Sequence, residues 1–125
     1  MSTKAAVRHS GDVAIVDLAG NVTLGQGTGM IRNTIKDLLN AGDKNILLNL
    51  REVGYLDSSG LGELVGAYAT VTNMGGRIKL LNAQTKVSNL LQVTKLYTVF
   101  VTFTDETEAV RSFAADGAAG GAPGS

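Results

Sequence analysis

The run of residues 45–50, Asn-Ile-Leu-Leu-Asn-Leu, is the part of the sequence that most constrains the fold. A strand with one face in water alternates apolar and polar residues, whereas a nearly continuous aliphatic run is typical of a strand buried on both faces. A sheet that contains such a strand is covered by helices. We therefore predict an α/β fold in which this run is a central strand.

Strand patterns and helix patterns alternate along the rest of the chain. Short β-like segments on either side of the turn signal Ser10-Gly11-Asp12 predict an opening β-hairpin. Beyond it, apolar residues recur at helical spacing, and strand-like runs separate these segments. The hairpin strands are predicted at 5–9 and 13–18, the helices at 28–41, 61–73, 85–93 and from 104 onward, and the later strands at 77–81 and 99–103. Because strands and helices alternate, we expect helices packed against a mostly parallel central sheet, with right-handed crossovers between its strands.

The chain has the length and composition of one domain with its own core, with 125 residues of which 44% are hydrophobic. The last predicted helix would bury Ala109, Val110 and Phe113. Residues 114–125 contain no side chain larger than Asp or Pro and cannot bury enough apolar surface to offset the entropy of ordering. We predict a domain over residues 1–113 and a disordered Gly/Ala-rich tail over residues 114–125.

Charge and composition argue against several kinds of partner. The 11 basic and 11 acidic residues balance without a like-charge run, so nothing favours nucleic acid or an anionic membrane surface. No apolar run approaches the about 18 residues that a membrane helix needs. Cysteine is absent, which fits a reducing compartment. We expect a soluble cytoplasmic protein.

The sequence also offers little material for catalysis. His9 is the only histidine and is interpreted as a solvated turn residue. A nucleophile at Ser58 would need a base, and its neighbour Asp57 would point away from it on an extended segment. The carboxylates are scattered without a spacing that suggests acid and base roles or a metal site. We predict a protein that is not an enzyme and binds no metal or cofactor.

The loop 25–29, Gly-Gln-Gly-Thr-Gly, precedes a predicted helix. Glycine-rich loops in that position bind phosphates through free backbone N–H groups and the helix dipole. This loop lacks the GxGxxG spacing of dinucleotide sites and the Lys-Ser/Thr that ends a P-loop. Two interpretations stay open, a loop that contacts a partner and a cradle for a nucleotide.

Residues 55–62, YLDSSGLG, place small polar side chains between a short apolar segment and a predicted helix. Asp57, Ser58 and Ser59 would occupy capping positions, where a side-chain oxygen accepts from the free N–H groups of a helix start. One such residue would satisfy the cap, and here three stand together before Gly60 and Gly62, which keep the surface open. Because a helix start carries partial positive charge, it would also stabilise a phosphate. We expect that a serine here can be modified without unfolding the domain.

Residues 50–68, above all DSSGLG at 57–62 with Gly66 one turn later, resemble the signature of the bacterial anti-sigma factor antagonists. These are single-domain proteins of the STAS fold. The resemblance extends over most of the chain, from the hairpin to Leu96, and leaves out the tail. It implies an N-terminal β-hairpin followed by alternating helices and strands around a mostly parallel sheet.

The resemblance implies a phospho-switch. In that family the unmodified antagonist binds an anti-sigma factor that is also a serine kinase, which frees the sigma factor; the kinase phosphorylates the antagonist with ATP, and a serine phosphatase reverses the step. By position the phosphoacceptor is Ser58, directly after the aspartate, with Ser59 as the fallback. The implied partner-binding residues are Thr23, Gly25, Gly27, Asp57, Ser58, Ser59, Gly60, Leu61 and Gly62.

One segment departs from the family's pattern. After the second strand the family commonly has Gly-Glu-aliphatic-Asp, whereas this chain has Gly-Asn-Val-Thr-Leu at 20–24, so both acidic residues are missing. In the family this loop contributes to the kinase contact. Two alternatives to the phospho-switch therefore stay open: a STAS scaffold or assembly module that is not phosphorylated, and a small-ligand or nucleotide-binding module that uses residues 25–29.

Overall fold

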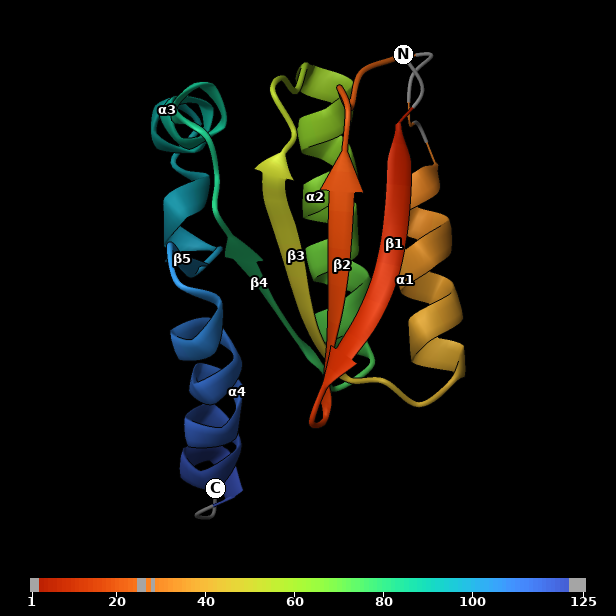
Figure 1. Ribbon diagram of the computed structural model, residues 1–125, viewed down its shortest axis with the longest axis vertical. Coiled ribbons are helices and arrows are strands. Elements are labelled where there is room, and N and C mark those ends of the chain that lie inside the picture. Colours follow the sequence, from red (N-terminus) through yellow and green to blue (C-terminus); the bar gives the residue numbers. More distant parts are fainter. Residues whose placement is uncertain (1–2, 25–26, 28, 122–125) are drawn as a thin grey trace.

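A five-stranded sheet in the order β1-β2-β3-β4-β5 forms the centre of the molecule (Figure 1). The computed structural model describes residues 3–24, 27 and 29–121, with side chains up to Asp116. β1 is antiparallel to β2, and the other neighbouring strands are parallel. The strands are β1 Lys4–Ser10, β2 Val13–Ala19, β3 Asn45–Glu52, β4 Arg77–Leu81 and β5 Thr102–Phe103. The opening hairpin and the mostly parallel sheet confirm the predicted α/β fold.

Helices cover both faces of the sheet. They are α1 Met30–Asn40, α2 Ser58–Asn73, α3 Thr85–Val93 and α4 Glu106–Gly121, with a short 3-10 helix η1 Leu96–Thr98. The larger core lies between the sheet and α1, α2 and α3 and includes Leu48 of β3. The smaller core lies beneath α4, where Ala109 and Phe113 pack with Leu47. Successive residues of β3 thus point into opposite cores, which confirms the prediction of a central strand buried on both faces.

The last strand is shorter than predicted. The pattern at 99–103 predicts a strand, but β5 contains only Thr102 and Phe103. The N–H groups of Val99 and Phe100 both donate to Leu96 O at 2.9 Å, so this backbone closes the 3-10 turn and does not pair with β4. Phe100 still reaches the larger core, where its ring meets that of Tyr68 edge-on at 5.5 Å.

The last helix is longer than predicted. α4 continues through residues 114–121, which lie in the predicted disordered tail. Alanine has the highest helix propensity of all residues, and Asp116 anchors this turn by accepting a hydrogen bond from Lys79 Nζ at 2.5 Å. Residues 122–125 of the predicted tail lie outside the described residues. Within the described part of the chain, no helix combines the length and apolar character needed to cross a membrane.

Candidate functional site at the start of helix α2

Asp57 caps helix α2. Its backbone is extended (φ −101°, ψ −170°), and its Oδ1 accepts from the N–H of Gly60 at 3.0 Å. The helix begins at Ser58, so Ser58 and Ser59 are its first two residues. The prediction that all three polar residues occupy capping positions is wrong for the serines: the carboxylate of Asp57 makes the cap, and both serines belong to the helix.

The same carboxylate holds the loop that follows β2. Asp57 Oδ2 accepts from the N–H of Leu24 at 3.0 Å, across 33 residues of sequence. A parallel bridge between Val22 and Leu56 reinforces this contact, and the N–H of Val22 donates to Tyr55 O at 3.1 Å. The segment 22–24 is therefore fixed beside the start of α2.

These hydrogen bonds determine the charge of Asp57. The N–H of Leu24, followed by that of Gly60, stabilises the carboxylate and lowers the pKa of Asp57 below its usual value. The side chain is therefore ionised throughout the neutral range. A permanent negative charge stands directly before the first serine of the helix.

Two glycines in the motif have opposite surroundings. A Cβ at Gly60 would lie 2.1 Å from the carbonyl oxygen of Val22 and 3.1 Å from Leu56 Cδ2, so only glycine lets the two segments approach. A Cβ at Gly62 or Gly66 would meet nothing within 4 Å. Gly60 therefore has a packing role, whereas Gly62 and Gly66 leave two positions on the surface of the helix without a side chain.

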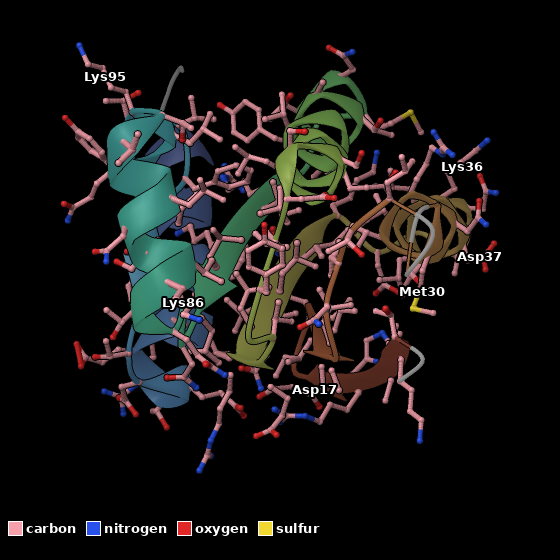
Figure 2. All side chains as sticks on the ribbon, turned by 90° about the horizontal axis from the view of Figure 1, so that it is seen from above. Asp17, Met30, Lys36, Asp37, Lys86 and Lys95 are labelled. Atoms are coloured by element: carbon pink, nitrogen blue, oxygen red, sulfur yellow. The ribbon has the colours of Figure 1, made fainter. Side chains whose placement is uncertain are left out.

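A groove of about 520 Å³ separates the start of α2 from α3. Its lining residues are Tyr55, Leu56, Asp57, Ser58, Leu61, Lys86, Asn89, Leu90 and Thr94. Ser58 is exposed and lines this groove, whereas Ser59 is half-buried and does not. Figure 2 looks onto the end of the sheet where α2 begins and shows α3 and α1 on either side of it.

The structure brings most of the predicted site residues together. Residues 57–62 form the start of α2, and Thr23 lies half-buried in the segment that Asp57 holds. Gly27 has φ +80°, and a Cβ there would lie 2.8 Å from Thr3 Oγ1, so Gly27 packs against the N-terminal segment. Gly25 lies outside the described residues.

Sequence reasoning missed the α3 side of the groove. This side consists of Lys86, Asn89 and Leu90 of α3 and of Thr94, the residue that caps its C-terminal end, about 30 residues after the motif. The only local signal was that Lys86 and Asn89 lie off the apolar face of that helix. Such a signal shows exposure but not which neighbour the exposed face meets.

His9 lies far from Ser58. It approaches Asp43, with Nε2 3.1 Å from Oδ2, just before β3 begins, whereas Ser58 follows the other end of β3. An eight-residue strand spans about 26 Å at about 3.3 Å per residue. The histidine therefore cannot serve as a base for the Ser58 hydroxyl in this structure.

Comparisons with known proteins agree with this architecture. A family model for the STAS domain matches residues 4–109. The chain is 25% identical over 111 residues to the anti-sigma F factor antagonist of Paenibacillus polymyxa, which covers 88% of this chain and 94% of that protein. It is 28% identical over 96 residues to the anti-sigma-B factor antagonist of Bacillus subtilis (strain 168), which covers 77% of this chain and 86% of that protein.

Solved structures share the fold. An anti-sigma factor antagonist from Mycobacterium paratuberculosis matches with a TM-score of 0.80 at 17% identity and covers 90% of this chain and 95% of its own. The Bacillus cell fate determinant SpoIIAA in its phosphorylated form matches with a TM-score of 0.67 at 22% identity and covers 87% of this chain and 98% of its own. With its hairpin, its mostly parallel sheet and a family match over most of its length, this chain belongs to the STAS domain family.

Proposed function

We propose that this protein is an anti-sigma factor antagonist that works as a phospho-switch at Ser58. In its unmodified form it binds an anti-sigma factor that is also a serine kinase, and the sigma factor is released. Phosphorylation of Ser58 abolishes this binding, and a serine phosphatase restores it. The protein is a substrate in both steps and acts in the cytoplasm. The names of the relatives from Paenibacillus polymyxa and Bacillus subtilis support this assignment.

The observation that carries the proposal is the placement of the Ser58 hydroxyl. It stands exposed at the first residue of α2, and it lines the groove beside α3. A kinase needs a hydroxyl that it can reach, and the half-buried Ser59 meets that need less well. The rigid cap at Asp57 presents Ser58 in one defined position.

The surface around Ser58 also explains why a phosphate would release a partner. Leu24 is 77% exposed and Tyr55 is 48% exposed, and apolar and aromatic side chains of this kind form the centres of protein interfaces. A phosphate adds a charge of about −1.5 to −2 beside the ionised Asp57. A partner packed there would meet repulsion and a desolvation cost, so binding is lost without refolding.

Intact-mass measurement after incubation with the cognate kinase and ATP tests the acceptor. We expect one added phosphate in the wild type and in Ser59→Ala, and none in Ser58→Ala. Phosphorylation of Ser58→Ala at the wild-type level would transfer the assignment to Ser59 or to another residue. Both serines lie in the first helical turn, so the two alanine variants remove neighbouring hydroxyls from the same part of the helix.

A pull-down of the anti-sigma factor tests the switch. We expect the partner to be retained by the wild type and by Ser58→Ala and to be released by Ser58→Asp. Equal retention by all three would favour the unphosphorylated scaffold or assembly module. Heat released on titration with common nucleotides would instead favour a ligand-binding module that uses residues 25–29.

A further inference from the structure

Lys86 lines the same groove as the proposed phosphoacceptor Ser58. The residues before and within the start of α2, with Ser58 among them, form one wall, and Lys86, Asn89, Leu90 and Thr94 form the α3 wall. Figure 2 shows Lys86 on α3. Two segments about 30 residues apart thus contribute an acceptor hydroxyl and an ammonium group to one concave surface.

The ammonium of Lys86 is available for a new contact. Within the part of the chain that the structure describes, it has neither an ion pair nor a hydrogen bond, and the side chain is exposed. Lys79 is different, because its ammonium already binds Ser112 and Asp116. A lysine carries its charge on a flexible four-carbon stem, so it can reach a group that appears on the facing wall.

The charges that line the groove favour this contact. Asp57 is its acidic residue and Lys86 is its basic one. Both oxygens of Asp57 already accept N–H groups, from Leu24 and Gly60, and the negative charge would repel a phosphate on the next residue. Among the described residues that line the groove, Lys86 is the one cation that can compensate this repulsion.

We propose that Lys86 is the intramolecular partner of phosphorylated Ser58, and that its ammonium pairs with the phosphate across the groove. Modification then adds negative charge to the contact surface, and the ammonium of Lys86 holds the phosphate at the groove. This inference rests on the proposed phosphorylation of Ser58 and specifies how the modified state is held.

A titration of the phosphate by phosphorus NMR tests the pairing. Phosphoserine is installed at position 58 of the full chain during translation, so the result does not depend on any kinase. The second pKa of a phosphoserine lies near about 6, and a nearby cation lowers it by favouring the dianion. We expect Lys86→Gln to raise the phosphate pKa by about half a unit or more relative to the wild type.

Two further variants make the titration decisive. Lys86→Arg keeps the charge and should leave the phosphate pKa near the wild-type value. Lys95→Gln removes another exposed charge that does not line the groove, and it should also leave the value unchanged. An unchanged phosphate pKa in Lys86→Gln, or an equal rise in Lys86→Gln and Lys95→Gln, would overturn the pairing. The kinase assay on Ser58→Ala decides the proposed function separately.

Discussion

Gly60 and Gly62 occur in the same motif for different physical reasons. Gly60 is required because the carbonyl of Val22 lies where its Cβ would be, so the close approach of two backbones excludes a side chain. Gly62 is exposed at an open position of α2, where a methyl group meets nothing. Glycine is therefore required at position 60 by backbone packing, whereas at position 62 it only keeps the surface of the helix free of a side chain.

The matched pair Gly60→Ala and Gly62→Ala separates these two constraints. We expect Gly60→Ala to lower the free energy of unfolding by about 1–3 kcal/mol, because the backbones must move apart. We expect Gly62→Ala to raise it by up to about 1 kcal/mol, because alanine favours an exposed helical position over glycine. Urea unfolding followed by circular dichroism measures both, and equal stabilities would contradict the close approach at Gly60.

Asp57 connects the helix start to the loop before α1. If its carboxylate holds the N–H of Leu24, then Asp57→Ala should make that amide exchange hydrogen faster. Asp37→Ala, at an exposed position on α1, serves as the control and should leave the exchange of Leu24 unchanged. Exchange of Leu24 at the wild-type rate in Asp57→Ala would show that the loop is held by other contacts.

Among the elements, α4 is attached to the sheet through a buried charge. Lys79 of β4 is 5% exposed, and its ammonium lies 4.7 Å from the ring centre of Phe113. Ser112 Oγ accepts from it at 2.8 Å and Asp116 Oδ2 at 2.5 Å. A buried ammonium is tolerated because it is paired. The burial of Lys79 on the sheet therefore requires the last turns of α4, and these turns are held to the sheet by Lys79.

Asp116→Ala and Lys79→Met should affect stability differently. Asp116→Ala leaves a buried ammonium without its anion and should lower the free energy of unfolding by about 1 kcal/mol or more. The loss is limited because the side chain of Asp116 is 48% exposed. The second removes the charge together with its desolvation cost and should be close to neutral. Urea denaturation of both variants checks this order, and a larger loss in Lys79→Met would contradict it.

At the scale of the whole molecule, Arg8 joins the beginning of the chain to its last helix. Its Nε lies 2.6 Å from Asp17 Oδ2 on β2, and its Nη2 lies 2.6 Å from Glu106 Oε1 at the start of α4, 98 residues away. The hydrogen bonds with Arg8 lower the pKa of both carboxyl groups. The three side chains are partly exposed, so salt screens their interaction.

These lowered pKa values predict how stability depends on pH. A carboxyl group whose pKa is lower in the folded state contributes stability that is complete above its unfolded value, near about 4 for Asp and Glu. That contribution is lost as the pH falls through the lower folded value. We expect the urea midpoint of the wild type to fall below about pH 4 and to fall less in Arg8→Gln. Equal pH profiles at low salt would show that Arg8 contributes nothing.

Most of the fold could be predicted from local patterns. The runs at 45–50 and 77–81 and the helix at 85–93 were placed well because the period of apolar residues depends only on neighbours in the sequence. The prediction was wrong where a local turn competed with the strand pattern. The pattern at 99–103 favoured a strand, but the N–H groups of Val99 and Phe100 close a turn on Leu96, so β5 contains only Thr102 and Phe103.

The candidate site was also predictable only in part from the sequence. The sequence by itself determined the alternation of strands and helices and the presence of a capped helix after the segment 53–56, because periodicity and capping chemistry are properties of short segments. Only the tertiary structure decided that Asp57 binds the N–H of Leu24, that Lys86 shares a groove with Ser58, and that Lys79 pairs with Asp116. Each of these contacts joins segments about 30 residues apart, and only the packing of helices on the sheet brings such segments together.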